Sequence, residues 1–594
     1  MRIKYIDVLK AFAIIAVVLY HTGLMTYGYL GVDLFLVIAG YLTTKSLYVK
    51  MMTSKTLVEE GKFYIKFELS RIIRLLPPLL VAGIICMLVG FFVMLPDDYE
   101  NLSQSVIATN GFVNNILSAI TTKNYWDISN DYKPLMHTWY VGVVMQFYLV
   151  YPILFLFARL NKNDSKKTLL TIVSTLATIS LLVYFVTINI AERFYYLPSR
   201  FFEFAVGGIA ALIYNPNEDK PFGKGYVYLC YVLLLALLFI NNEMISAIIR
   251  LVLVVGLSCV LLCSQDVLEN RITGNTVFAK IGVASYSIFI WHQILLAFYR
   301  YTIASVFTIG SYTIILIGTA LMSWLSYKFV EQGALNALKS KSEKAILYTS
   351  TALAFLALSA FSGVIFMRAG IVRDVPELYI SKNDIHRGMH AEYCDRGYLY
   401  DKPFTTDKIH WYVIGNSFGR DFVNVILESP ISDKVEISYS TDINFGKEKE
   451  RFSNADRVFL SSLGLNEDLV TKVEIMCLAS GLNLNQLVIV GEKNFGECNG
   501  QIYAHRNDDG YFEQFIDVYR PERYIDDNKH FAELYGNRFL DLMSMVTNDK
   551  KQVRVFTPDH HFISADCRHL SRGGAIYFAD RINWNKYIND KSLK

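Results

Sequence analysis

The chain has 594 residues and a formal net charge of +3; 53% of its residues are hydrophobic and only 19% are charged. The nearly balanced charge excludes the strongly basic profile of a nucleic-acid-binding protein. So small a charged fraction beside so many apolar residues excludes a chain that is water-soluble throughout. We therefore expect a membrane part that lies in a lipid bilayer, and no nucleic-acid partner.

The first stretch, Tyr5 to Gly40, holds two apolar runs, each about long enough to span a bilayer. Lys10 and His21 lie in the first run, and a helix would place them on one face, about 16 Å apart along its axis. Ionisable side chains in a span face the bundle interior and indicate function. The two residues therefore mark two depths of an interior path. In the alternative interpretation, Lys10 reaches the headgroups and His21 is a hydrogen-bonded structural residue.

Hydropathy predicts eleven spans, at 7–25, 29–49, 75–95, 136–158, 168–190, 202–214, 225–241, 246–264, 281–300, 310–330 and 345–367. Lysine and arginine gather in the connections 50–74, 159–167 and 339–344, whereas 96–135 is poor in them. Basic connections stay in the cytoplasm, so the N-terminus is expected inside and residues 368–594 outside. The first span is too long for the apolar region of a signal peptide and lacks a small-residue cleavage site.

The cysteines fall into two sets of four, one in the apolar spans and one in the polar C-terminal third. None has zinc-type spacing, so we predict no metal site. An oxidising compartment would permit one disulfide in the second set, with three full pairings open. That set is Cys394, Cys477, Cys498 and Cys567, of which Cys477 lies in an apolar helical stretch and can stay free.

Arg71 and Arg74 form an R-x-x-R pair just before the third expected span. At this spacing they share a helix face, and guanidinium groups suit phosphates. The tendency of basic residues to stay on the cytoplasmic side explains the pair equally well. Further along come four more segments: PLMHTWYVGVVMQFYLVYP (134–152), YYLPSRFFEFAVGG (195–208), SYSIFIWHQ (285–293) and SYKFVEQGAL (326–335).

In order and spacing, these segments and GYLGVDLFLVIAGYL resemble membrane acyltransferase family 3 over roughly residues 5–335. Members move acyl groups, usually acetyl, onto extracytoplasmic glycans. The resemblance implies that His21 is catalytic and that Lys10, Arg71 and Arg74 bind acetyl-CoA, the acyl donor. The matching positions also include His137, Trp139, Gln146, Tyr148, Arg200, Glu203 and His292.

The sequence departs from the family pattern at three places. Lys10 stands where Arg is usual and keeps the charge without the bidentate fork. Val144 and Met145 stand where many members have glutamates, so no carboxylate base is assigned there, and Gly333 replaces a usual Pro. Arg200 and Glu203 could form an ion pair that is structural or contacts substrate. His292 ranks below His21, because one structural histidine in a bundle is common.

The composition turns charged and rich in turns from Arg368 onwards. The apolar stretches HWYVIG, DRVFLSSL, NQLVIVG and QVRVFTP alternate with helical stretches, which predicts an α/β domain with a parallel sheet. We expect a transmembrane domain at 1–335, an extra transmembrane helix and linker at 336–375, and an extracytoplasmic domain at 376–594.

Two motifs at the ends of that domain suggest serine chemistry. Ser417 follows the first strand on a small-residue turn at the start of a helix, where a hydroxyl is exposed near backbone N–H donors. His569 could deprotonate Ser417, and Asp566, three residues earlier, could orient the ring.

This pairing resembles the SGNH hydrolase family, which has a flavodoxin-like three-layer fold. Asn416 stands where its usual Asp precedes the serine. The resemblance implies oxyanion donors, for which Gly464 and Asn494 are the best candidates.

Together these features predict an O-acyltransferase of the bacterial cytoplasmic (inner) membrane. It would carry acetyl from cytoplasmic acetyl-CoA to a hydroxyl of an extracytoplasmic glycan such as lipopolysaccharide O-antigen, capsule or peptidoglycan. His21 would act in the bundle, and Ser417 outside. Two alternatives stay open: a carbohydrate esterase attached to a transporter-like bundle, and a passive transporter with an inert binding domain.

Overall fold

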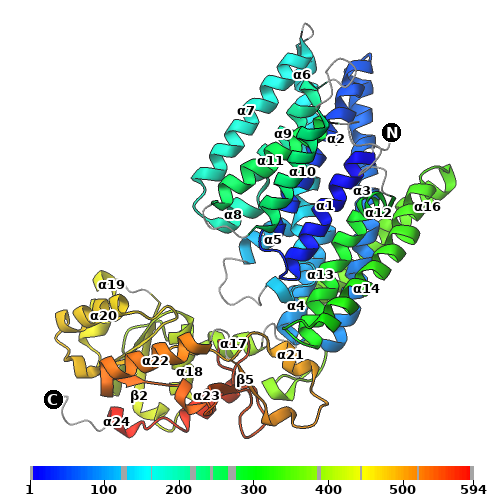
Figure 1. The fold of residues 1–594 in the computed structure, drawn as a ribbon. Coiled ribbons are helices and arrows are strands. Elements are labelled where there is room, and N and C mark those ends of the chain that lie inside the picture. The colour runs from blue at the N-terminus through cyan, green and yellow to red at the C-terminus, as the bar shows by residue number, and fades with distance from the viewer. Residues whose placement is uncertain are drawn as a thin grey trace. The chain divides into compact units, whose positions relative to one another are not determined.

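In this computed structural model the described residues are 4–121, 130–161, 164–214, 223–240, 245–264, 276–383, 389–441, 445–517 and 521–588. They divide into two compact units, Met1–Phe92 with Asn101–Phe366 and Val93–Glu100 with Met367–Lys594. The first unit is helical and the second combines helices with strands (Figure 1). Residues 122–129 of the expected outer connection lie outside the described residues.

The first unit is a bundle built around α1 and α2, in which α1 packs against α2, α12 and α13, and α2 packs against α9 and α11. Its helices are α1 Lys4–His21, α2 Gly31–Thr53, α3 Leu57–Val93, α5 Asn114–Thr121, α6 Trp139–Leu160, α7 Ser165–Val186, α8 Ile190–Tyr195, α9 Leu197–Ile213, α10 Lys224–Phe239, α11 Ala247–Cys263, α12 Thr276–Val283, α13 Ser285–Thr302, α14 Ile309–Leu325, α15 Gln332–Ala337 and α16 Lys341–Met367; α4, Pro96–Asn110, bridges the boundary between the units.

Glycines allow the close approach of α2 and α9. A Cβ on Gly40 would meet the backbone carbonyl of Phe204, and a Cβ on Gly207 would meet that of Val37. Small residues at such crossings let helix backbones touch, as is common in membrane bundles. The contact fixes the register of the two helices that carry Asp33 and Arg200.

Every expected span coincides with a helix, but fewer than eleven of these helices are long and apolar enough to cross a membrane. Among the described residues, seven helices are long and apolar enough to cross a membrane. An eighth span arises if α12 and α13, bent by 74° at their junction, count as one. Of the rest, α1 carries Lys4, Asp7 and Lys10, while α10 and α11 have only 16 and 17 residues.

The second unit is built on a five-stranded sheet in the order β2-β1-β3-β4-β6, with all neighbours parallel. This is the strand order of flavodoxin-like doubly wound sheets. The strands are β1 Ile409–Ile414, β2 Val435–Ser440, β3 Arg457–Ser461, β4 Leu487–Val490 and β6 Phe539–Leu540, and the helices include α17 Met389–Asp395, α18 Ser417–Leu427, α19 Phe445–Ser453, α20 Glu467–Ala479, α21 Asn499–Ala504, α22 Pro521–Tyr535, α23 Arg572–Ala579 and α24 Asn585–Ile588.

Both faces of this sheet are buried, which makes the unit three-layered. Along β1, Trp411 and Val413 pack against α18 and α23, whereas Tyr412 and Ile414 pack against α19, α20 and α22. The alternation follows from the period of two in a strand. The sequence therefore predicted an α/β unit with a parallel sheet correctly.

One expected strand was assigned to the wrong sheet. QVRVFTP contains β7, Gln552–Arg554, which pairs antiparallel with β5, Phe515–Asp517, in a separate two-stranded sheet. The fifth strand of the main sheet is instead β6, whose two residues are too short to give an apolar pattern. The expected strands also omitted β2, whose sequence VEISYS mixes polar with apolar residues.

The expected disulfide is absent from the structure, in which all of the cysteines are free thiols. Cys477, on α20, packs in the core between this helix and the sheet. The thiols of Cys394 and Cys567 donate to the Leu570 carbonyl and to Asn499 Oδ1. Burial raises the pKa of the Cys498 and Cys567 thiols well above the usual value; the Asp98 charge adds to the shift of Cys498, and the Asp566 charge to that of Cys567.

Candidate functional site

Three predicted donor-site cations lie around one cavity in the helical unit. Lys10 on α1 and Arg71 and Arg74 on α3 line a cavity of about 400 Å³. Asp7 also lines it, and its Oδ1 lies 3.6 Å from Lys10 Nζ. One carboxylate among three cations leaves the cavity net positive, which suits a phosphate-bearing ligand.

Aromatic rings hold Arg71 at the edge of this cavity. Its guanidinium carbon lies 4.6 Å from the ring centre of Phe67 and 5.1 Å from that of Tyr148, a residue of the 134–152 motif. Stacking fixes the planar group without neutralising its charge. Arg71 therefore keeps its charge for a ligand.

A second cavity, of about 570 Å³, is lined by His21, His137, Asp33, Arg200 and Arg300. His21 ends α1, and its Nδ1 lies 3.0 Å from Nε2 of His292 on α13. Arg300, also on α13, donates from Nη2 to the His21 carbonyl at 2.7 Å. The structure thus separates Lys10 from His21 into two cavities.

Tyr140 and Phe289 line both cavities and form a shared wall. Their ring centres lie 5.3 Å apart, and Phe289 also contacts His137 at 4.9 Å between ring centres. His137 is 2% exposed, and among the described residues neither ring nitrogen has a hydrogen-bond partner. A buried polar ring at a cavity wall is free to bind a ligand there.

The expected pair of Arg200 and Glu203 is part of a buried triad. Arg200 Nη1 lies 3.1 Å from Glu203 Oε1, and Arg200 Nη2 donates to Asp33 Oδ1 at 2.6 Å. Asp33 and Arg200 line the histidine cavity. The attraction between two carboxylates and one guanidinium offsets much of the desolvation cost of burying these charges.

In the second unit Ser417 is the first residue of α18, directly after β1. Gly415 has φ +146°, and a Cβ there would meet the Ser461 carbonyl, so only glycine fits this turn. Strands β2 and β3 lie on opposite sides of β1, which is the switch point where ligands bind in such sheets. The Ser417 hydroxyl is buried and has no hydrogen-bond partner among the described residues.

Asn416 caps α18 and ties the serine turn to the loop after β3. Its Oδ1 accepts from the N–H groups of Phe418 at 3.2 Å and Leu463 at 3.0 Å. Its Nδ2 donates to the Leu463 carbonyl at 3.0 Å. The Asp that is usual at this position of the SGNH pattern could not make this last bond, because an ionised carboxylate has no N–H to donate.

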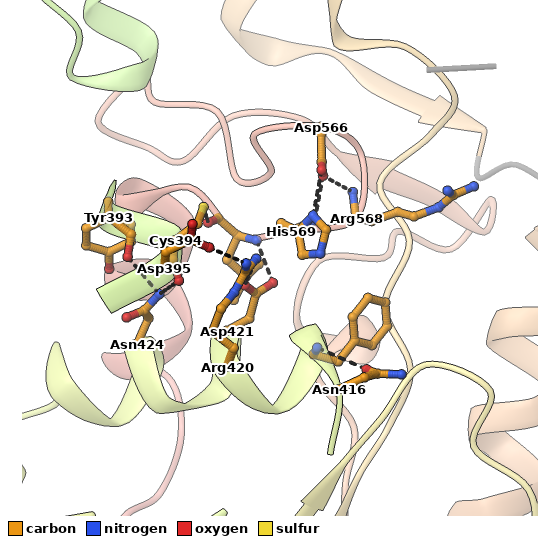
Figure 2. A network of polar contacts seen from close by, with 12 residues as sticks. Tyr393, Cys394, Asp395, Asn416, Arg420, Asp421, Asn424, Asp566, Arg568 and His569 are labelled. Atoms are coloured by element: carbon orange, nitrogen blue, oxygen red, sulfur yellow. Dashed lines mark hydrogen bonds and ion pairs between the residues drawn. The ribbon is translucent and has the colours of Figure 1, made fainter. Parts of the chain in front are cut away.

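Asp566 holds His569 by its ring and by its backbone. The distance from His569 Nδ1 to Asp566 Oδ2 is 2.5 Å, and Asp566 Oδ1 accepts from the backbone N–H of His569 at 2.7 Å and of Arg568 at 3.0 Å. Figure 2 shows the ring between Asp566 and the first turn of α18, near Asn416. The ring centres of His569 and Phe418, the residue after Ser417, lie 6.4 Å apart in an edge-on contact.

A buried ion pair supports the same loop. Asp421 on α18 accepts from the N–H of Leu570, which follows His569, at 2.9 Å. Lys493 Nζ lies 3.0 Å from Asp421 Oδ2 and 3.4 Å from the ring centre of Phe418. Figure 2 shows Asp421 and Arg420 on α18 beside this loop. Burial lowers the pKa of Lys493, while Asp421 opposes the shift.

The two oxyanion candidates lie after neighbouring strands but in different settings. The Gly464 N–H, after β3, donates to the Glu492 carboxylate, as does that of Leu465 at 2.8 Å. Asn494, after β4, is fully buried; its Oδ1 accepts from Gly496 N–H at 3.0 Å, and its Nδ2 has no partner among the described residues. Asn494 thus has a donor to offer, whereas the Gly464 donor is engaged.

The family is decided by comparison with known proteins. A family model described as an acyltransferase domain matches residues 3–328. The chain belongs to this acyltransferase family.

Similar curated proteins include O-acetyltransferase OatA of Staphylococcus aureus strain NCTC 8325 / PS 47 and the same-named protein of strain MRSA252. Each is 26% identical over 357 residues, which cover 55% of this chain and 56% of the relative. The chain thus spans little more than half the length of the curated relatives it matches. No solved structure matches it.

Sequence reasoning ranked His292 below His21 and did not foresee some of the contacts at these sites. His292 contacts His21, and His137 lies at the same cavity. Their signal was available, because each is a histidine in a segment that carries the family resemblance. Arg300 could have been singled out, because it is a charged residue inside an expected span. The pairing of Lys493 with Asp421 could not, because the two positions are too distant in sequence for any local pattern.

Proposed function

We propose that this protein is a membrane O-acetyltransferase that carries acetyl from cytoplasmic acetyl-CoA to a hydroxyl of an extracytoplasmic glycan. One observation carries the proposal: within a bundle of the acyltransferase family, a cationic cavity and a histidine cavity share a wall of Tyr140 and Phe289. A donor with phosphates fits the first cavity, and acyl chemistry fits the second.

In the donor step, Lys10, Arg71 and Arg74 bind the CoA phosphates, and the thioester reaches towards His21. The carbon–sulfur bond breaks and CoA leaves as a thiolate. His21 acts either as the transient acceptor, whose ring nitrogen bonds the acyl carbon, or as the base that takes the proton of an incoming hydroxyl.

In the delivery step, the Ser417 oxygen attacks the acyl carbon, and the bond from that carbon to its previous carrier, the His21 nitrogen or the CoA sulfur, breaks. Ser417 then holds the acyl group as an ester. His569 takes the Ser417 proton and releases it to water, where it balances the CoA thiolate, so that His569 is again a base. The glycan hydroxyl then attacks the ester carbonyl, His569 accepts that hydroxyl's proton, and the Ser417 oxygen leaves and is reprotonated. Asp566 keeps the His569 ring oriented. Asn494 Nδ2 donates to the oxyanion, and the Gly464 N–H joins it once Glu492 moves away.

We further propose that the protein lies in the bacterial cytoplasmic membrane with its N-terminus inside and residues 368–594 outside. The support is the excess of lysine and arginine in the connections 50–74, 159–167 and 339–344. This topology makes the relay necessary, because acetyl-CoA and the glycan are then on opposite sides. The acceptor classes are lipopolysaccharide O-antigen, capsule and peptidoglycan.

Trapping the acyl enzyme tests the proposal. Purified full-length protein is mixed with acetyl-CoA labelled in the acetyl group, quenched with acid, digested and analysed by mass spectrometry. We expect acetyl on the peptide that contains Ser417, and its loss in Ser417→Ala. Ser453→Ala, an exposed serine at the end of α19, is the matched control and should keep the label.

Equal labelling of wild type and Ser417→Ala on that peptide would contradict the relay. The fate of the label separates the alternatives. Transfer to added glycan supports the acetyltransferase, whereas release only as free acetate would show a carbohydrate esterase. A protein that never takes label from acetyl-CoA would favour a passive transporter.

A further inference from the structure

His292 contacts the histidine to which the proposed function assigns the donor-side chemistry. It lies in the middle of α13, is 1% exposed, and its Nε2 lies 3.0 Å from His21 Nδ1. On sequence grounds it ranked below His21. The contact raises the question of which ring donates.

The other nitrogen of His292 answers this question. His292 Nδ1 lies 3.0 Å from the carbonyl oxygen of Ile288, one turn earlier on α13. A carbonyl only accepts, so Nδ1 carries the hydrogen, and in the neutral ring Nε2 is an acceptor. Two charged rings would present N–H to N–H in a buried site, which their repulsion disfavours.

The direction of the chain of hydrogen bonds is therefore fixed. His21 Nδ1–H donates to His292 Nε2, and His292 Nδ1–H donates to Ile288. His21 Nε2 keeps its lone pair, and this is the nitrogen left for a ligand in the cavity that the ring lines. Both proposed roles of His21, base and transient acceptor, require that lone pair.

The same helix holds the backbone of His21. Arg300, eight residues after His292 and thus about 80° further round α13, donates from Nη2 to the His21 carbonyl at 2.7 Å. Helix α13 thus fixes both the end of α1 and the orientation of its last side chain. A residue that merely fills space would need neither ring nitrogen, yet both nitrogens of His292 are used.

We propose that His292 is a positioning residue that sets the tautomer of His21, with hydrogen on Nδ1 and the lone pair on Nε2. This inference rests on the proposed function of His21. His292 plays the part that a carboxylate plays towards the histidine of a serine triad, but as a neutral acceptor suited to a bundle interior.

Two substitutions separate positioning from packing. His292→Phe keeps a buried planar ring but removes the acceptor, whereas His292→Gln keeps an acceptor oxygen near the position of Nε2. We expect His292→Phe to lower kcat for acyl uptake from acetyl-CoA by about 100-fold or more with little change in KM, since a wrong tautomer disables the base. His292→Gln should recover most of that loss. Trp291→Phe, a buried neighbour on α13, should stay near wild type.

Nitrogen NMR of full-length protein with ¹⁵N-labelled histidine reads the tautomer directly. We expect the His21 signals, assigned by their loss in His21→Ala, to show hydrogen on Nδ1, and His292→Phe to change them. Hydrogen on Nε2 of His21 in the wild type, or wild-type kcat in His292→Phe, would overturn the inference. Low kcat in both His292 variants, each folded by size-exclusion chromatography, would also overturn it, because the acceptor would not matter.

Failure of the proposed function would give a different pattern of acyl uptake in these variants. If His21→Ala itself keeps wild-type acyl uptake, the bundle chemistry is wrong, whatever His292 does. If His21→Ala is inactive while His292→Phe is fully active, the function stands and only the positioning role is lost.

Discussion

At the residue scale, Asp566 and His569 form the most completely specified part of the site. One carboxylate accepts from the His569 ring and from two backbone N–H groups, so the side chain and the loop are oriented together. The three-residue spacing of D-x-x-H makes this possible, because the loop can wrap around the carboxylate. This part of the site was therefore visible in the sequence.

Asp566→Asn should disable the site without removing its shape. The amide can turn its NH₂ towards His569 Nδ1 and stabilise the wrong tautomer of the ring. We expect glycan acetylation to fall by about 10³-fold or more, as for the equivalent change in a serine triad. The measurement is the rate of acetyl transfer to glycan at matched protein level. Asp559→Asn, an exposed carboxylate before the same loop, is the control; a loss under tenfold in Asp566→Asn would contradict the assigned role.

The Asp566 carboxylate should make the free energy of unfolding fall at acid pH. Burial opposes its ionisation, but the His569 charge and the hydrogen bonds from His569 and Arg568 outweigh it and lower the pKa of Asp566 to about 2. A carboxyl with a depressed pKa stabilises the fold fully above its unfolded pKa of about 4, and this contribution is lost as the pH falls towards the folded pKa.

Calorimetric unfolding of the full chain in detergent checks this dependence. The difference in free energy of unfolding between wild type and Asp566→Asn should be constant above about pH 5 and shrink below about pH 4. A difference that persists unchanged to about pH 2 would show that Asp566 is not stabilised as the ion.

At the element scale, α18 organises the second unit's site. Its first residue is Ser417, its cap Asn416 binds the loop after β3, and Asp421 on its second turn binds the loop that carries His569. The turn after β1 was predictable from its small residues. The ion pair between Asp421 and Lys493 was not predictable. Asp421 follows β1 and Lys493 follows β4, and the two meet only because both strands pair with β3.

Breaking the Lys493–Asp421 pair should destabilise this arrangement. Among the described residues, Lys493→Met leaves Arg420, at 3.4 Å, as the remaining cation beside buried Asp421. Removing one member of a buried pair costs about 3–5 kcal/mol when no counter-charge remains, so we expect a loss below that range. Asp421→Asn in the same chain removes the stranded charge and keeps an acceptor for the Leu570 N–H. Unfolding of the two single variants and the double variant is measured by calorimetry. The double variant should be more stable than Lys493→Met; equal stabilities would show that the pair is not coupled.

At the scale of the whole molecule, the sequence predicted the division into a helical and an α/β part, each from a different signal. Apolar runs located the helices, and alternation of strands with helices indicated the parallel sheet. The number of spans could not be read in this way, because α1 carries charges and α10 and α11 are short. The grouping of His21, His137 and His292 also escaped, because it comes from packing of α1 and α13 with the turn Met136–Thr138 before α6 rather than from spacing.

The central claim is that an acetyl group passes from a cytoplasmic donor through the bundle to Ser417 and then to a glycan. Sealed membrane vesicles with the cytoplasmic face outward, supplied with labelled acetyl-CoA outside and glycan inside, test it most directly. We expect label on the enclosed glycan with the wild-type protein. His21→Ala should leave acetyl-CoA unused, and Ser417→Ala should use donor but leave the glycan unlabelled. Wild-type labelling of the glycan in either variant, at matched protein level, would contradict the account.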